Sequence, residues 1–171
     1  MTATKAKRST IRHYLDTSTT TGTSTWSRLG NAVGAAEIAY NPQTEETADI
    51  TMDTKVTDIT GYARSFAIEG VVYPGDAVFD LIDGMRRDMA VLDDLKADLL
   101  HVWAYLAPTV TGTPPAEVST WPAEKVPVNV GIETFGGEGA TVAKIKYTLY
   151  DAGDPVKGMF DPAAGTFTPD A

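Results

Sequence analysis

The segment ETFGGEGATVAKIKY, residues 133–147, places three glycines within four positions between two stretches of alternating polarity. After the glycines, apolar or aromatic side chains occupy every second position from Ala143 to Leu149, and the same period of two runs upstream from Val128 to Ile132. A period of two indicates strands with one buried face. The glycines therefore predict the turn of an antiparallel β-hairpin.

A phosphate-binding loop is the alternative interpretation of these glycines, and the flanking residues disfavour it. The dinucleotide-binding fingerprint needs a third glycine and a following helix, because the amides at the start of that helix hold the pyrophosphate. Here Gly139 is followed by three other residues and then by the alternating stretch. Glu138 lies inside the turn and would repel a phosphate.

Further strands are expected where apolar residues alternate or cluster between polar connections. These segments are residues 35–40, 47–52, 55–60, 62–73 and 97–107. The polar stretch YNPQTEE, residues 40–46, is expected to be a connection, and the nearly continuous apolar run at 97–107 predicts a strand covered on both faces. Near the C-terminal end, Asp161 and Pro162 begin a turn and Gly165 supplies a positive-φ position, which predicts a second tight hairpin.

One helix is expected, at about residues 75–91. Its apolar stripe consists of Val78, Ile82, Met85 and Met89, at spacings of four, three and four residues. Asp76 can cap the helix, because its carboxylate can accept from the free amides of the first turn. The patterns together predict a mainly β fold, a β-sandwich or partial barrel, with this helix at its flank.

Two segments lack the patterns of regular strands. Residues 1–25 combine a basic start with the threonine-rich tract DTSTTTGTST, so they are expected to form an extended N-terminal arm ahead of a domain that spans 26–171. Residues 108–127 hold five of the ten prolines and are expected to form an extended surface loop. Trp121 in this loop either folds back onto the core or anchors a partner.

The charge of the chain argues against nucleic-acid recognition. The formal net charge is -9, and residues 26–171 carry 10 basic and 22 acidic side chains. Duplex binding depends on Lys and Arg side chains that displace counterions from phosphates. No apolar run approaches the ~18 residues of a membrane-spanning helix, so no membrane partner is expected.

No catalytic, cofactor-binding or metal-binding constellation is recognisable, and an enzyme is not expected. Cysteine is absent, and the two histidines, His13 and His101, are far apart in sequence. His101 lies in an apolar run and is expected to be a hydrogen-bonded core residue. The acidic stretch at 49–58 lacks the Gly at the sixth position and the Glu at the twelfth that a calcium-binding EF-hand loop needs.

Several longer motifs follow one another in a recognisable order. They are WSRLG from Trp26, EIAYNPQTEE from Glu37, TDITGYARS from Thr57, VVYPGDAVFDLIDGMR from Val71 and VPVNVGIETFGGEGATVAKIKYTLYDAGDPVKGMFDPAAGTFTP from Val126. In this order they resemble the major tail proteins, or tail tube proteins, of long non-contractile-tailed bacteriophages, especially siphophages of Gram-positive hosts. The resemblance covers residues 26–169, and the segment at 108–127 has no counterpart in it.

This resemblance implies a structural function without a cofactor. Proteins of this family form hexameric rings that stack into a tube, and strands of neighbouring subunits join into one barrel around a lumen through which genomic DNA passes. The implied partners are further copies of the chain and the tape-measure, tail-tip and tail-terminator proteins, while DNA passes without specific binding. The implied location is the tail of the virion, with assembly in the host cytoplasm.

Two sets of charged residues are candidate contact sites under this interpretation. The acids that are expected to line the lumen or the joints between rings are Glu45, Glu46, Asp49, Asp53 and Asp58. An acidic lumen would let DNA slide, whereas acids on the outer face would serve only solubility. The basic residues that are expected to dock the arm on an acidic neighbour are Lys5, Lys7, Arg8 and Arg12.

Three other interpretations remain open. The inner-tube protein of a contractile tail or injection system shares the general architecture. A monomeric β-sandwich carbohydrate-binding module would use aromatic residues such as Trp103 and Trp121 as stacking platforms. A capsid decoration protein would form trimers or monomers on shells.

Overall fold

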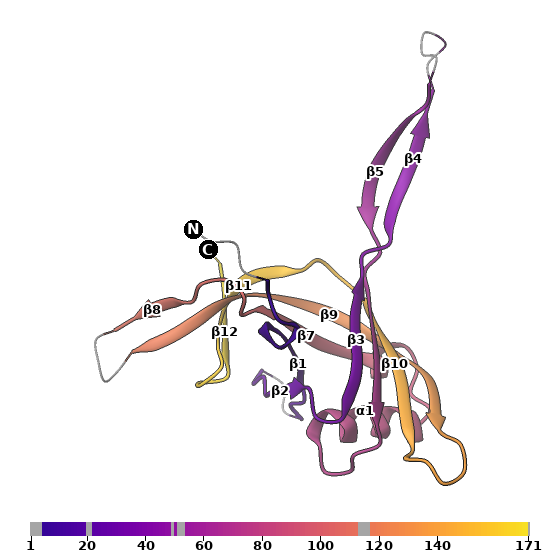
Figure 1. Cartoon of the computed structure of the whole chain (residues 1–171), viewed down its shortest axis with the longest axis vertical. Coiled ribbons are helices and arrows are strands. Elements are labelled where there is room, and N and C mark those ends of the chain that lie inside the picture. Colours follow the sequence, from indigo (N-terminus) through magenta and orange to yellow (C-terminus); the bar gives the residue numbers. More distant parts are fainter. Residues whose placement is uncertain (1–4, 20–21, 49, 51–53, 113–116, 171) are drawn as a thin grey trace.

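The computed structural model describes residues 5–19, 22–48, 50, 54–112 and 117–170 (Figure 1). In this part the chain forms twelve β-strands, one α-helix and two short 3₁₀ helices. The strands are β1 (Ile11–Asp16), β2 (Trp26–Leu29), β3 (Val33–Ala39), β4 (Pro42–Thr47), β5 (Val56–Tyr62), β6 (Ser65–Val71), β7 (Lys96–Trp103), β8 (Thr109–Thr111), β9 (Val118–Gly136), β10 (Lys144–Asp151), β11 (Val156–Asp161) and β12 (Thr166–Pro169). The helices are α1 (Ala77–Arg87), η1 (Arg8–Thr10) and η2 (Leu92–Leu95).

Ten strands form one antiparallel sheet, and the other two form a separate hairpin. Along the sheet the order is β2-β1-β7-β9-β10-β6-β3, while β8 and β11 pair with β9 and β12 pairs with β11. β4 and β5 pair only with each other within the described ranges. The prediction of a mainly β fold with one flanking helix is confirmed, and the sheet is open rather than closed into a barrel.

The two hairpins predicted from turn residues are present. β9 and β10 pair up to Gly136 and Lys144, with the glycine-rich segment as their connection. In the C-terminal hairpin of β11 and β12, the carboxylate of Asp161 accepts from the amides of Ala163 and Ala164, and Gly165 has a φ of 65°. Both turns thus form at the residues from which they were predicted.

The predicted helix is also present, and it ends earlier than expected. Asp76 caps it, because its Oδ1 accepts from the amides of Val78 and Phe79, both at 3.1 Å. The end is set by Met89, whose φ of 50° stops the helix, while the amide of Ala90 donates to the carbonyl of Met85 at 3.0 Å. This is the hydrogen-bond pattern of a Schellman motif. Met89 is therefore 82% exposed and does not belong to the apolar stripe.

The main core lies between α1 and one face of the sheet. Val78 and Ile82 of the helix are buried against strand residues such as Ile68, Ile145 and Leu149. β7 is covered on both faces, as predicted, because the four consecutive side chains from Leu99 to Val102 are all buried. The strand ends at Trp103 rather than at 107.

The expected arm at 1–25 is wrong for Ile11–Asp16, which forms β1 inside the sheet. β1 pairs with β2 on one side and with β7 on the other. His13, Tyr14 and Leu15 are all buried, so this segment buries side chains on both faces although three of its six residues, Arg12, His13 and Asp16, are polar. The threonine-rich tract begins a connection in which the carboxylate of Asp16 accepts from the amides of Ser18 and Thr25, each at 2.9 Å.

The expected proline-rich loop at 108–127 is wrong for Val118–Pro127, which is the first half of β9. This strand pairs with β11 from Trp121 to Lys125 and with β10 from Val128 onward. Pro127 lies where the partner changes from β11 to β10, and Pro122 lies one residue beyond the end of the ladder with β7, which stops at Ala123. Prolines are tolerated at such interruptions because they lack an N–H for the ladder.

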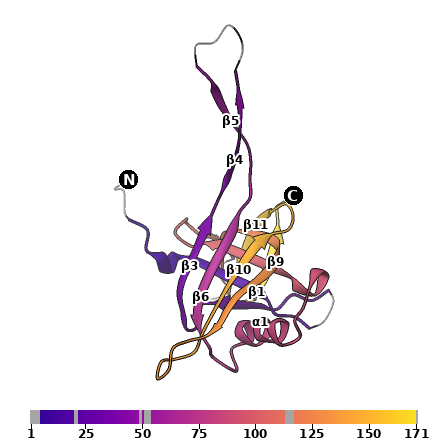
Figure 2. The ribbon, with the colours of Figure 1, turned by 90° about the vertical axis from the view of Figure 1, so that its right-hand side faces the viewer.

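The stretch YNPQTEE is not a connection, because Pro42–Thr47 forms β4. Together with β5 it makes a hairpin that continues β3 and β6 and extends away from the body (Figures 1 and 2). Of the strand expected at 47–52, Thr47 belongs to β4, and residues 49 and 51–52 lie outside the described residues. The strand expected at 62–73 is divided, since Tyr62 ends β5 and β6 begins at Ser65.

None of the helices within the described residues is long and apolar enough to cross a membrane.

Candidate functional site

The strongest structural feature for function is a sheet segment with two free edges, formed by β3, β6, β10 and the end of β9. We call it the four-strand segment. Of β9, it includes only Val130–Gly136. In the described part of the chain, β3 pairs only with β6, and Val130–Gly136 pairs only with β10, because the ladder with β7 ends at Asn129. Both edges therefore present backbone N–H and C=O groups that a further strand could pair with.

The two faces of the four-strand segment differ in character. One face carries Val130, Ile145 and Ile68 into the core beneath α1. On the other face, Lys144 pairs with Glu69 at 3.0 Å and Lys146 pairs with Glu133 at 3.1 Å.

The second carboxylate oxygen of Glu133 accepts from the hydroxyl of Thr148 at 2.6 Å. The hydrogen bonds from Thr148 and Lys146 lower the pKa of Glu133. Each lysine on this outward face thus has its own carboxylate partner, and the exposed Glu37 on the same face leaves an excess of one negative charge.

The β4–β5 hairpin brings together three of the five acids predicted as contact residues. Glu45, Glu46 and Asp58 lie on it, whereas Asp49 and Asp53 lie outside the described residues. Glu46 pairs with Lys55 at 2.9 Å, and Glu45 lies directly opposite Asp58 in the register. Like charges in opposite positions of an antiparallel pair are destabilising. The hairpin therefore carries an acidic spot that a cationic neighbour would relieve.

The hairpin is exposed on both of its faces. Every residue of β4 is exposed, and so is every residue of β5 except Gly61. Its apolar side chains include Val56 at 43% exposure and Ile59 at 58%. An isolated two-stranded hairpin is marginally stable in water, so this element is suited to contact with another chain.

The base of the hairpin is held to the body by a cluster of charges around Arg64. The guanidinium of Arg64 pairs with Asp151 at 2.7 Å and also with Glu124, and the three side chains are 15%, 19% and 14% exposed. Burial opposes the charged form of Arg64, but the hydrogen bonds that it donates to the two carboxylates outweigh this effect and raise its pKa. Beside it, the amide of Ala63 donates to the carbonyl of Asn41 at 3.2 Å.

A buried histidine pair lies between β1 and β7. The Nδ1 atoms of His13 and His101 are 2.7 Å apart, so one ring donates and the other accepts. Burial lowers the pKa of His13 to about 3 and that of His101 to about 4, with further contributions from nearby positive charges. His101 is a hydrogen-bonded core residue, as predicted. Its partner could not be predicted, because His13 lies in the segment interpreted as an arm.

The basic residues of the N-terminal segment separate into two pairs. Lys5 and Lys7 are exposed. Arg8 donates to the carbonyls of Ile11 at 2.7 Å and Ala36 at 3.1 Å, so it reaches the free edge of β3. Arg12 places its guanidinium carbon 5.8 Å from the ring centroid of Trp121.

Trp121 lies in β9, and it packs beside the second buried cluster, which includes Tyr14, Leu100 and Phe160. Two candidate residues from separate predictions, Arg12 and Trp121, thus meet on the body of the molecule. A contact of Trp121 with a partner stays a prediction.

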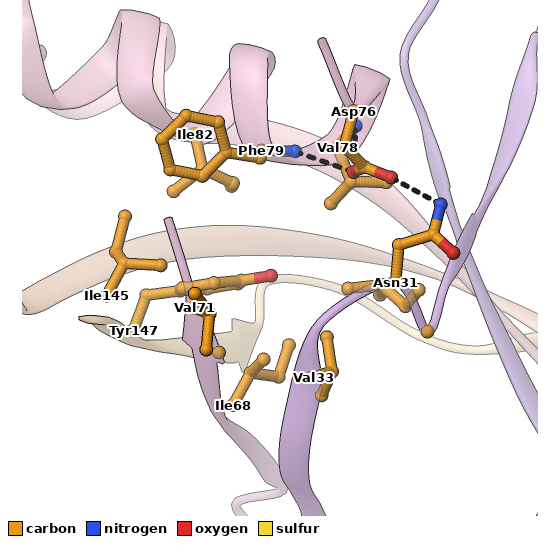
Figure 3. A pocket seen from close by; sticks show the side chains of 13 residues that line it. Asn31, Val33, Ile68, Val71, Asp76, Val78, Phe79, Ile82, Ile145 and Tyr147 are labelled. Atoms are coloured by element: carbon orange, nitrogen blue, oxygen red, sulfur yellow. Dashed lines mark hydrogen bonds between the residues drawn. The ribbon is translucent and has the colours of Figure 1, made fainter. Parts of the chain in front are cut away.

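A small cavity under α1 offers little room for a ligand (Figure 3). Its volume is about 20 Å³, which is enough for a single water molecule. Asn31 donates to Asp76 at 2.9 Å at its rim, and burial, with a smaller effect of Asp76, raises the pKa of Tyr147. Figure 3 shows mainly apolar side chains around it, including Ile68 and Ile145. This is the lining of a core void rather than of a catalytic pocket.

The fold is shared with chains of two solved tail-type structures. One is a chain from the tail of an empty GTA particle with C6 symmetry, with a TM-score of 0.58, 15% identity and coverage of 96% of this chain and 99% of that chain. The other is a chain from the anti-feeding prophage (AFP) baseplate, six-fold symmetrised, with a TM-score of 0.50, 8% identity and coverage of 91% and 97%. Neither a protein-family model nor a curated protein matches the sequence. At these identities the likeness shows the fold.

Proposed function

We propose that the chain is a structural subunit of a phage tail tube, of the major tail protein type found in siphophages. The observation that carries this proposal is the pair of free edges on the four-strand segment, β3 on one side and Val130–Gly136 on the other. The shared fold with a chain of the GTA particle tail and one of the AFP baseplate supports it.

The two free edges are suited to head-to-tail assembly. The β3 edge of one subunit pairs with the Val130–Gly136 edge of the next, and this contact is heterologous, because it joins two different surfaces. A heterologous contact closes into a ring when the rotation between subunits allows it. Closure pairs both free edges of each four-strand segment and makes one continuous barrel of strands from six subunits.

In such a ring, the outward face of the four-strand segment becomes the wall of the lumen. Its lysines, Lys144 and Lys146, are each paired with a glutamate. Phosphate binding requires free cationic groups that displace counterions. A wall whose lysines are all paired and which carries the further acid Glu37 lets DNA pass without specific binding.

The β4–β5 hairpin makes the contact between stacked rings. It is exposed on both faces and carries the opposed acids Glu45 and Asp58, so a neighbouring ring supplies both the burial and the cations that it lacks. The exposed Lys5 and Lys7 provide positive charge for such a contact. The tube then joins tape-measure, tail-tip and tail-terminator proteins in the virion tail, after assembly in the host cytoplasm.

Electron microscopy of the purified chain across a concentration series tests the proposal. We expect rings with a central hole and stacked tubes with six-fold rings. Preformed tail tips serve as seeds, because subunits of a tube can wait for a nucleus. Compact monomers at every concentration, even with seeds, would overturn the proposal and favour the monomeric carbohydrate-binding module.

A second candidate is the inner-tube protein of a contractile tail or injection system, which uses the same ring architecture. This candidate is supported by the fold that the chain shares with a chain of the AFP baseplate as well as with one of the GTA tail. A sheath gene beside the gene for this chain would favour the second candidate, and its absence would favour the first.

A further inference from the structure

The free edge of β3 is not fully open, because the side chain of Arg8 lies across it. Figure 2 shows the N-terminal segment beside β3. The Nη2 of Arg8 donates to the carbonyl of Ala36 at 3.1 Å, and its Nη1 donates to the carbonyl of Ile11 at 2.7 Å. One guanidinium thus bridges the start of β1 and the middle of β3, two strands that lie far apart in the sheet order.

The carbonyl of Ala36 belongs to the set of groups that an added strand would need. Backbone groups of an antiparallel strand point alternately toward one neighbour and the other. Since the carbonyl of Ala36 points away from β6 to Arg8, the groups of Ile38, two residues on, point the same way. A strand that pairs with this edge donates to Ala36 and Ile38. Arg8 and the incoming strand therefore compete for the same oxygen.

Arg8 is placed so that it can leave this oxygen. It is exposed, and within the described residues it forms no ion pair. The structure holds its guanidinium by hydrogen bonds to the two carbonyls. The departing guanidinium is hydrated at once, because it already faces solvent. Its departure does not uncover a buried charge, which would be costly.

The surface beside Arg8 can compensate for this displacement. A groove next to the β3 edge is lined mainly by apolar side chains, among them Ile11, Ile38 and Trp103. In strand addition, main-chain hydrogen bonds give affinity and grooves for alternate side chains give specificity. An incoming strand both replaces the bond of Arg8 and covers this groove.

We infer that Arg8 guards the β3 edge of the free subunit and is displaced when Val130–Gly136 of a second copy pairs there. The inference rests on the ring contact proposed above, which supplies the incoming strand. Natural proteins blunt free strand edges with charged side chains to suppress unwanted pairing. The side chain of Arg8 blocks the edge but can be displaced. Subunits therefore stay apart until a ring or a seed offers an incoming strand that both pairs with β3 and covers the groove.

The assembly of the variant Arg8→Ala into tubes tests directly whether Arg8 suppresses pairing at the β3 edge. We expect the protein concentration at which half of the chain is in tubes to fall roughly three- to tenfold, because each contact no longer has to displace a hydrogen bond from a charged donor. Arg28→Ala is the matched control, since it removes an exposed arginine from β2, a strand that pairs with neither β3 nor the hairpin. A purely structural role of Arg8 predicts the opposite direction, with a lower melting temperature and no easier assembly.

A peptide with the sequence of residues 128–137, VNVGIETFGG, tests the same contact without tubes. Labelled with a fluorophore, it should bind Arg8→Ala roughly three- to tenfold more tightly than the wild-type or Arg28→Ala chain in an anisotropy titration. Equal peptide affinity and equal assembly of folded Arg8→Ala and wild type would overturn the guard. If the wild type never assembles and Arg8→Ala still binds the peptide more tightly, the guard holds and the tube proposal fails.

Discussion

The body of the molecule and the β4–β5 hairpin are held together by opposite means. In the body, Leu149, Val128 and Ile82 are fully buried within one chain, and even the polar His13 and His101 find a partner there. In the hairpin, the strands pair only with each other among the described residues, and one cross-strand position opposes Glu45 and Asp58. The comparison shows that the body forms its core within one chain, whereas the hairpin strands bury no side chain of their own.

The largest effect should come from a cavity in the body. Leu149→Ala removes a fully buried side chain and should lower the free energy of unfolding by about 2–5 kcal/mol. The matched hairpin change is Ile59→Ala, where the side chain is 58% exposed and the expected cost is within about 0.5 kcal/mol. Urea unfolding of both variants measures the contrast. Comparable costs would show that the hairpin is part of the body in the free chain.

The next effect concerns the junction between the two regions. Arg64→Met leaves Glu124 and Asp151 largely buried without their shared cation, which should cost about 2–4 kcal/mol. The control is Arg87→Met, which removes an arginine that is 66% exposed and leaves Asp83 paired with Arg86, so it should cost less than about 1 kcal/mol. Urea unfolding gives both values. Equal losses would mean that Arg64 acts as a surface charge and does not anchor the hairpin.

A third prediction uses pH, because the histidine pair belongs to the body alone. Both pKa values are lowered by burial, to about 3 and about 4, so the unfolded chain binds protons at a higher pH than the folded chain. The stability from the neutral pair is complete above pH ~6.5, the ordinary value for histidine, and is lost as the pH falls toward the folded values. Each histidine contributes a slope of at most ~1.4 kcal/mol per pH unit.

Urea unfolding between pH ~7 and ~5 isolates this effect, because carboxylates protonate mainly below that range. The variant His13→Asn/His101→Asn should flatten the slope, whatever its overall stability. If the free energy of unfolding depends on pH with the same slope in the variant, other groups cause the pH dependence. The buried histidine pair would then contribute nothing to it.

The sequence predicted those features that depend on residues close together in the chain, and it missed those that depend on distant contacts. Helix α1 was predictable, because its stripe and its cap at Asp76 lie within a dozen residues. Its end was not, since Met89 adopts a positive φ that favours glycine or asparagine. β1 was missed because its burial depends on His101, which is 88 residues away in the chain.

The hairpin and the candidate site were predictable only in part. The acids were identified from composition, but the opposition of Glu45 and Asp58 depends on a register that shifts at Gln43 and Thr44. β4 consists of one proline, one glutamine, two threonines and two glutamates and buries no side chain, so the alternation that marks a strand is absent from it. The free edges of β3 and β9 follow from strand order, which the sequence did not specify.

The smallest effect on the single chain should be the most informative about assembly. Glu45→Lys turns the opposed acids into a pair of opposite charges, which should stabilise the free chain by no more than about 0.5 kcal/mol. The same change should weaken stacking between rings, because the acidic spot no longer matches a cationic neighbour. Tube length and disassembly temperature at several salt concentrations, read by electron microscopy and light scattering, measure this second effect.

The control for this last prediction is Asp170→Lys, which makes the same change of charge at an exposed position near the C-terminal end. Salt screens charge interactions at exposed sites, so the difference between the two variants should shrink as salt rises. If both variants shorten tubes equally at low salt, the overall charge of the subunit governs stacking, and the hairpin has no special part in it. If only Glu45→Lys does so, the region that is weakest in the single chain is the one that joins the rings.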